Sequence, residues 1–242
     1  MGISLEEIWK YLKEKNNFRI VFLGDSITST EWVHPNWREI VEYVLKDQLE
    51  EKMADWKTSS WGIRAINSGF DGATCKDLIE KLDSDVFSYN PALVIAIIGK
   101  NDMHLHTSPE IHREEVKELI GKLSEKVPFV VYGSSTPTLK EEVNERYAQY
   151  VEQVKTLFPF KNVQFVNLFE KCKQFDLSKL FTFVSTGEEV LELKPGEIDC
   201  YHPNQLGNAY IAKVILKEVF DIDFDPERYM KDTLAGEMYP GY

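Results

Sequence analysis

Asp199 and His202 are three residues apart, a spacing that allows their side chains to form a hydrogen bond. They stand just before a final apolar helical pattern, and Pro203 fits the first turn of that predicted helix. The Asp199 carboxylate can accept a hydrogen bond from one imidazole nitrogen, which leaves the other nitrogen to take a proton from a hydroxyl. The pair is therefore predicted to be a general base with its orienting partner.

Ser26 is the candidate nucleophile for that base. It lies in Gly24-Asp25-Ser26, directly after the apolar run 20–23. A serine hydroxyl is a poor nucleophile at neutral pH, so it needs an adjacent base, which in turn needs an orienting partner. Alone, such a tripeptide is more often a turn with a solvated serine. Together with the other polar clusters, it predicts a catalytic triad of Ser26, His202 and Asp199.

Acyl transfer also requires hydrogen-bond donors for the oxyanion of the tetrahedral intermediate. The backbone N–H groups of Ser26 and Gly72 and the side-chain amide of Asn101 are predicted to supply them. Glycine suits position 72 because a side chain there would hinder the approach of the backbone to the reacting carbonyl. Gly69, in the same polar run 67–72, is the alternative donor.

The polar clusters follow predicted strands, which positions them. Five short segments predicted as strands alternate with helical patterns: 18–23, 64–67, 92–98, 127–132 and 163–166. The runs 20–23 and 92–98 are purely apolar, which is typical of a strand buried on both faces. This alternation predicts βαβ units and an α/β fold with a parallel sheet covered on both faces. Because the carboxyl ends of parallel strands meet at one edge, Ser26, Gly72 and Asn101 are expected to lie together there.

The chain is predicted to form a single domain over residues 1–242, because no internal repeat or flexible linker interrupts it. An irregular insertion is expected around 177–198, where 181–185 and 190–193 either pair as a hairpin or remain extended. A C-terminal tail begins at about residue 221.

Composition excludes several classes of partner. The formal net charge of −12 disfavours nucleic acid, and no apolar run is long enough to span a membrane. The N-terminus lacks the pattern of a signal peptide. Three scattered cysteines, without the spacing of a metal site or a disulfide framework, are typical of reduced thiols and predict a cytoplasmic protein: Cys75, Cys172 and Cys200. The oligomeric state is left open.

Four sequence blocks, in this order, resemble those of the SGNH-hydrolase superfamily, the GDSL-type esterases and lipases. They are Gly24-Asp25-Ser26, residues 67–74, Gly99-Lys100-Asn101-Asp102 and residues 199–204. The resemblance implies a three-layer, flavodoxin-like α/β/α sandwich with about five parallel strands, and the same triad and oxyanion hole. The chain departs from the family in lacking a leucine after Ser26 and in carrying the large Lys100. The absence of a Gly-x-Ser-x-Gly elbow argues against the ordinary α/β-hydrolase fold.

The predicted function is that of a serine esterase acting on a short-chain, acetyl-type ester of a carbohydrate or other small alcohol. Trp32 and His34 lie in the loop after the first strand, where aromatic rings can stack on a sugar, and are weaker candidates for substrate binding. The alternatives are a lysophospholipase or thioesterase, and an acyltransferase using the same triad. A small-molecule binding protein of flavodoxin-like shape would leave Asp199 and His202 unexplained.

No cofactor and no metal ion is expected for this chemistry. Asp102, His104 and His106 alternate along one segment, so they could share a face, as metal ligands do. Histidines on polar loops are more often simply solvated, and serine-based acyl transfer needs no metal. The small-molecule ester is therefore the only partner that the sequence predicts.

Overall fold

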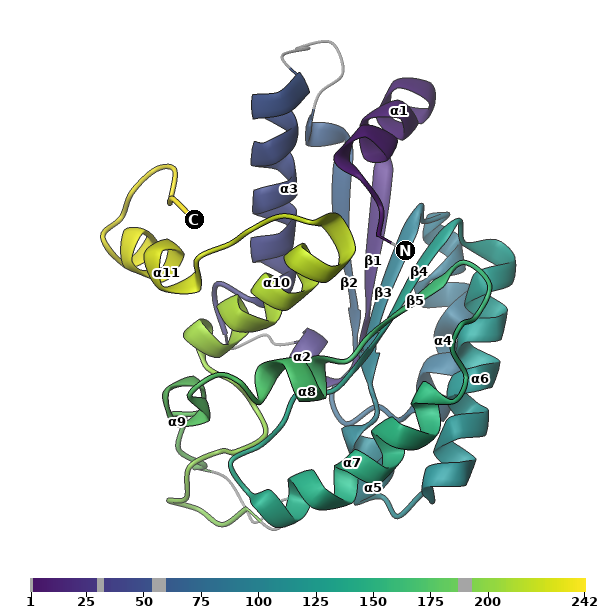
Figure 1. Ribbon diagram of the computed structural model, residues 1–242, viewed down its shortest axis with the longest axis vertical. Coiled ribbons are helices and arrows are strands. Elements are labelled where there is room, and N and C mark those ends of the chain that lie inside the picture. The colour runs from purple at the N-terminus through teal and green to yellow at the C-terminus, as the bar shows by residue number, and fades with distance from the viewer. Residues whose placement is uncertain (1, 30–32, 54–59, 187–192) are drawn as a thin grey trace.

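A parallel five-stranded sheet forms the centre of the protein (Figure 1). The computed structural model describes residues 2–29, 33–53, 60–186 and 193–242. The strand order is β2-β1-β3-β4-β5, with all neighbours parallel: β1 (Phe18–Gly24), β2 (Ile63–Gly69), β3 (Leu93–Ile98), β4 (Phe129–Ser134) and β5 (Val163–Val166). This order reverses the direction of winding between β1 and β3, which creates a topological switch point at their carboxyl ends.

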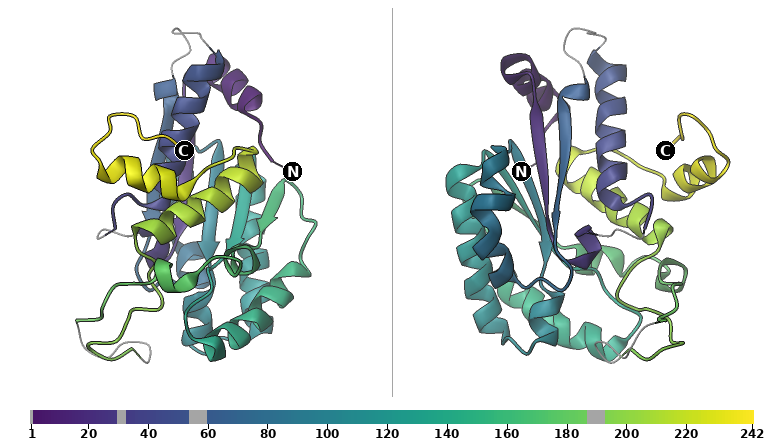
Figure 2. Two further views of the ribbon diagram at one scale, coloured as in Figure 1. Left: turned by 60° about the vertical axis from the view of Figure 1, so that its left-hand side comes forward. Right: turned by 180° about the vertical axis from the view of Figure 1, so that it is seen from behind.

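Alternate residues of each central strand enter two separate hydrophobic layers. Ile20 and Phe22 of β1 pack with α1 (Leu5–Lys15), α3 (Trp37–Met53) and α10 (Gln205–Phe220). Val21 and Leu23 pack on the opposite face with α4 (Cys75–Asp85) and α6 (Pro109–Lys126). Figure 2 shows these two groups of helices on either side of the sheet. Because both of its faces are buried, the central strand β3 is a continuous apolar run. The predicted three-layer α/β/α fold is confirmed.

Two short helices begin directly at the carboxyl edge of the sheet. They are α2 (Ser26–Ser29), which follows β1, and α5 (Lys100–His104), which follows β3. On the α6 side of the sheet, α7 (Glu141–Lys155) packs against α6. Two 3-10 turns lead into β2 and β3, namely η1 (Ser60–Gly62) and η2 (Phe87–Tyr89). The short helices carry the side chains predicted to act at this edge.

The last long helix begins later than the proline pattern predicts. Pro203 lies before the helix, and α10 starts at Gln205 because the Asn204 side chain caps it by accepting the N–H of Gly207 at 2.9 Å. An N-cap asparagine satisfies one of the N–H groups that a helix leaves unpaired at its start. Asp199 and His202 therefore lie on a loop that the cap anchors to α10.

The segment predicted as an irregular insertion contains α9 (Leu177–Leu180), preceded by α8 (Leu168–Cys172). Val184 forms an isolated antiparallel bridge with Ile198, and Asp199 N–H donates to Phe183 O at 2.8 Å. The expected partner strand 190–193 lies mostly outside the described residues. In the C-terminal tail, α11 (Pro226–Leu234) packs against α10. No helix in the described ranges combines the length and the apolar character needed to cross a membrane.

Candidate active site

The side chains of Ser26, His202 and Asp199 form a continuous hydrogen-bonded chain at the carboxyl edge of the sheet. Ser26 Oγ lies 2.9 Å from His202 Nε2, and His202 Nδ1 lies 2.7 Å from Asp199 Oδ2. All three residues are partly buried. The structure thus brings together residues 176 positions apart in the sequence. The arrangement allows the imidazole to accept the serine proton while the carboxylate holds the ring.

Asp199 is held as a carboxylate by hydrogen-bond donors. Its Oδ1 accepts the backbone N–H groups of Tyr201 at 2.8 Å and of His202 at 3.1 Å. Burial raises the pKa of Asp199, but these bonds and the one from the His202 ring together outweigh it, so the pKa lies below its usual value. An ionised Asp199 accepts the Nδ1 proton of His202. The Nε2 lone pair then faces Ser26.

Buried side chains of α3 position the helix that carries Ser26. Trp37 Nε1 donates to the carbonyl of Ile27 at 3.1 Å, and Arg38 Nε donates to the carbonyl of Thr28 at 2.5 Å. A helix as short as α2 leaves its last carbonyls without partners of its own, so these bonds stabilise its orientation. Trp37 is fully buried, which makes it a residue of the core rather than of a substrate surface.

Gly72 and Gly69 have different roles in the run that follows β2. Gly69 N–H donates to the Asn67 side chain at 3.0 Å, and an added Cβ at Gly69 would meet Ser29 N at 2.2 Å. Gly72 has a φ of +71°, a conformation that favours glycine, and a Cβ there would meet nothing within 4 Å. Its N–H makes no hydrogen bond to the described part of the chain. This contrast favours Gly72 over Gly69 as the oxyanion donor.

Asn101 links α5 to the Gly72 turn. Its Nδ2 donates to the carbonyl of Ala73 at 3.0 Å, and an amide nitrogen carries a second N–H that remains for an oxyanion. The N–H of Ser26, at the start of α2, likewise makes no hydrogen bond to the residues described. Three donors thus stand at the ends of three neighbouring strands, β1, β2 and β3. Ground-state carbonyls become better acceptors as they develop negative charge, which is the chemistry such donors serve.

A buried pair of opposite charges, Asp25 and Lys100, lies beside these groups. Asp25 is 2% exposed, and burial raises its pKa to about 6, although its Oδ1 accepts Ile27 N–H at 3.0 Å. Lys100 is 5% exposed, and burial lowers its pKa to about 8. Its Nζ makes no hydrogen bond to any described group. From the sequence, Lys100 differs from the family block only in being a large residue. No local pattern indicates that its side chain turns inward.

The remaining candidates from the sequence are placed differently. Trp32 lies outside the described residues. The exposed ring of His34 pairs with Glu39 at 3.2 Å, and it lines a groove of about 480 Å³ that Asn204 also borders. The ring of His104 packs edge-on against Tyr201, with centroids 4.9 Å apart.

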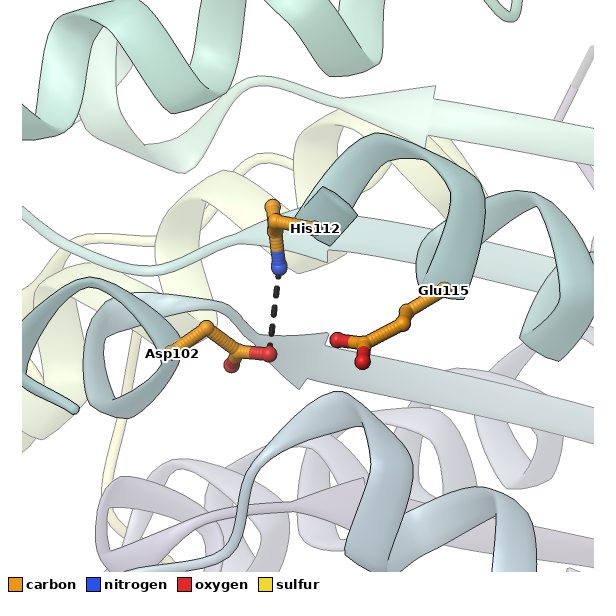
Figure 3. A group of neighbouring side chains, drawn as sticks. All are labelled: Asp102, His112 and Glu115. Carbon is orange, nitrogen blue, oxygen red and sulfur yellow. Dashed lines mark ion pairs between the residues drawn. The ribbon is translucent and has the colours of Figure 1, made fainter. Parts of the chain in front are cut away.

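Asp102 pairs with His112, a residue that the sequence-based hypothesis of a histidine-rich loop did not include. Its Oδ1 lies 3.2 Å from His112 Nδ1 (Figure 3). The same carboxylate accepts Cys75 N–H at 3.1 Å at the start of α4. Asp102 therefore connects three helices behind the donors of the predicted oxyanion hole. No local signal in the sequence links His112 to this position, because it comes from the next helix.

The sequence and the fold of this chain are similar to those of known proteins. The GDSL-like lipase/acylhydrolase family matches residues 22–210. An acetylxylan esterase of Geobacillus stearothermophilus is 23% identical over 228 residues, which cover 83% of this chain and 93% of that protein. The crystal structure of an acetylxylan esterase from Geobacillus stearothermophilus covers 86% of this chain and 95% of its own at 20% identity, with a TM-score of 0.63. LAE5, an alpha/beta hydrolase enzyme from the metagenome of Lake Arreo, Spain, covers 82% of this chain and 93% of its own at 19% identity, with a TM-score of 0.61.

Proposed function

The chain belongs to the GDSL-like lipase/acylhydrolase family, and we propose that it is a serine esterase that removes a short acyl group, acetyl, from a carbohydrate or other small alcohol. The observation that carries this proposal is the unbroken chain of hydrogen bonds from Ser26 through His202 to Asp199.

In the first half-reaction, Ser26 Oγ attacks the ester carbonyl while its proton passes to His202 Nε2. The carbonyl oxygen becomes an oxyanion, which the N–H groups of Ser26 and Gly72 and the amide of Asn101 stabilise. The bond to the alcohol oxygen then breaks, and that oxygen leaves with the proton from His202. The products are the free alcohol and an acyl ester on Ser26.

In the second half-reaction, water repeats the same steps. His202 takes a proton from the water as its oxygen attacks the acyl carbonyl, and the same three donors hold the oxyanion. Collapse of the intermediate returns the proton to Ser26 Oγ and releases the carboxylic acid. An acyltransferase differs only in that a second alcohol replaces the water.

The acetylxylan esterases among the similar proteins favour an acetylated sugar as the substrate class over the alternatives of a lysophospholipase or thioesterase. The groove beside His34 and Asn204 adjoins the loop of His202, and there it would hold part of the alcohol moiety. We assign Trp32 the same role from its place in the sequence. Three buried cysteines, none in a disulfide, support a reducing, cytoplasmic compartment: Cys75, Cys172 and Cys200.

The test is a panel of p-nitrophenyl esters from acetate to palmitate, run beside peracetylated xylose and acetylated xylo-oligosaccharides. We expect the highest kcat/KM for acetyl esters. In Ser26→Ala the rate should fall by up to about 10⁶-fold, with an unchanged circular dichroism spectrum. A preference for long chains would instead indicate a lysophospholipase or thioesterase. Faster product formation with added sugar acceptors, without acid release, would indicate an acyltransferase. Retention of more than about a tenth of the activity in Ser26→Ala would exclude Ser26 as the nucleophile.

A further inference from the structure

A cluster of three side chains, Asp102, His112 and Glu115, lies behind the active site between two helices (Figure 3). Asp102 comes from α5, while His112 and Glu115 are three residues apart on α6 and therefore share one face of that helix. One potential ligand atom from each residue lies within 4.8 Å of the other two. In Figure 3 the imidazole nitrogen and both carboxyl groups point into the same space.

The imidazole in this cluster is close to a carboxylate but is not hydrogen-bonded to it. His112 is 1% exposed, and its Nδ1 makes no hydrogen bond with any described group although Asp102 Oδ1 is 3.2 Å away. A buried polar nitrogen without a hydrogen bond is costly, so such atoms normally have a partner. Two ligand atoms of one metal ion also lie close together without a hydrogen bond between them, because each directs its lone pair at the ion rather than at the other ligand.

The two carboxyl groups also lack an ion-pair partner with a permanent positive charge. Asp102 is fully buried and Glu115 is partly buried. Within the described ranges, neither forms an ion pair with a lysine or arginine; the only ion pair here is that of Asp102 with His112. Buried charges are normally paired or coordinate a metal. A divalent cation would balance both carboxylates together.

We propose that Asp102, His112 and Glu115 form a binding site for one divalent transition-metal ion of the zinc type. One imidazole and two carboxylates suit zinc, whereas calcium and magnesium prefer oxygen ligands alone. Bonds of about 2.0–2.2 Å in tetrahedral geometry place ligand atoms about 3.3 Å apart. The pair of Asp102 and His112, at 3.2 Å, already has this separation. Glu115 has to move by about 1.5 Å at most, which a partly exposed glutamate can do.

The proposed metal site lies behind the oxyanion donors, so its role is to hold the surrounding helices in place and not to take part in the reaction. Asp102 adjoins Asn101, the predicted oxyanion donor, and its carboxylate also accepts the N–H of Cys75, just after the Gly72 turn. Such an outer contact orients a ligating carboxylate. A bound ion would therefore connect α5 and the start of α4 to α6, and would hold both oxyanion loops without touching the substrate.

Zinc binding by the tag-free, chelator-stripped full chain tests this proposal. We expect one zinc ion per chain by mass spectrometry, a rise in Tm on adding zinc, and visible absorption bands with cobalt(II) in its place. His112→Gln should weaken zinc binding by at least about 100-fold, and Glu115→Gln by about 10–100-fold. Loss of a residue that only supports a metal ligand lowers metal affinity by about 10–100-fold, and loss of a ligand itself should cost at least as much. Affinities are measured by competition with a chromophoric chelator.

Glu114→Gln is the matched control, since this glutamate occupies the next position on α6 and is exposed. It should bind zinc as the wild type does, as should His202→Gln, which separates the site from the triad. If His112→Gln does not fold, Glu115→Gln decides the question alone. No zinc uptake by the wild-type chain would refute the site. Equal uptake by the wild type, His112→Gln and Glu115→Gln would also refute it, because the ion would then lie elsewhere.

Discussion

Two aspartates belong to the surroundings of Ser26, Asp25 as its neighbour in the chain and Asp199 through His202, and their environments give them opposite properties. Asp199 is partly exposed and receives hydrogen bonds from two backbone N–H groups and the His202 ring. Asp25 is buried, and among the described residues its carboxylate accepts only the N–H of Ile27. The pKa of Asp199 is lowered, whereas burial raises that of Asp25 to about 6. The number of hydrogen-bond donors around each carboxylate thus decides which one stays ionised. Closeness to Ser26 along the sequence does not.

This difference fits the two residues for different tasks. A carboxylate with a pKa below its usual value stays ionised through the neutral range, and can orient His202 and stabilise the imidazolium that forms during the reaction. A carboxyl with a pKa of about 6 loses its charge just below neutral pH. Asp25 is therefore assigned a structural role in the loop after β1, where the positive charge of Lys100 favours its ionised form.

The largest expected effect on kcat/KM is that of replacing the Asp199 carboxylate by an amide. Asp199→Asn is expected to lower kcat/KM for p-nitrophenyl acetate by up to about 10⁴-fold, because an amide favours the wrong imidazole tautomer. Asp25→Asn is the matched control and should retain most of the activity. If Asp25→Asn proves as damaging as Asp199→Asn, the assignment of separate roles is wrong.

A smaller effect is expected on the oxyanion side of the site. Asn101→Ala should lower kcat by about 10²–10³-fold, since the lost donor acts on charge that develops only in the transition state. KM should change little for the same reason. Steady-state kinetics on acetyl esters measure both constants. A normal kcat with a raised KM would make Asn101 a substrate-binding residue instead.

The smallest effect concerns stability and its dependence on pH. A carboxyl whose pKa is raised in the folded state binds its proton more tightly there, so it contributes stability below the unfolded pKa and loses it as pH rises through about 6. A shift from 3.8 to about 6 corresponds to about 3 kcal/mol. At pH 4, just above the unfolded pKa of 3.8, most of this contribution is present, and at pH 7 almost none is. The unfolding free energy of Asp25→Asn, relative to wild type, should therefore increase by about 2 kcal/mol between pH 4 and pH 7. Urea titrations at both pH values measure it, and a constant difference would contradict the prediction.

The strands and the order of the polar clusters could be read from the sequence because both depend on local patterns. A strand buried on two faces requires an uninterrupted apolar run, such as 93–98, and the turn after it requires small or polar residues. The resemblance of four such turns to one family then grouped Ser26, Gly72, Asn101 and the pair in the last loop. The proline pattern predicts too early a start for α10, because the Asn204 cap, and not Pro203, sets the first residue of the helix.

Residue patterns therefore determined the fold class and selected the candidate catalytic groups, since both follow from the order of residues along the chain. The tertiary structure decided which groups meet and which are removed from water. Only helix packing brings Trp37 and Arg38 onto the carbonyls of α2, turns Lys100 inward, and places His112 rather than His104 beside Asp102. These choices depend on the distances between elements that are separated along the chain. Local spacing carries no information about such distances, because they are set by how the helices fill the space on each face of the sheet.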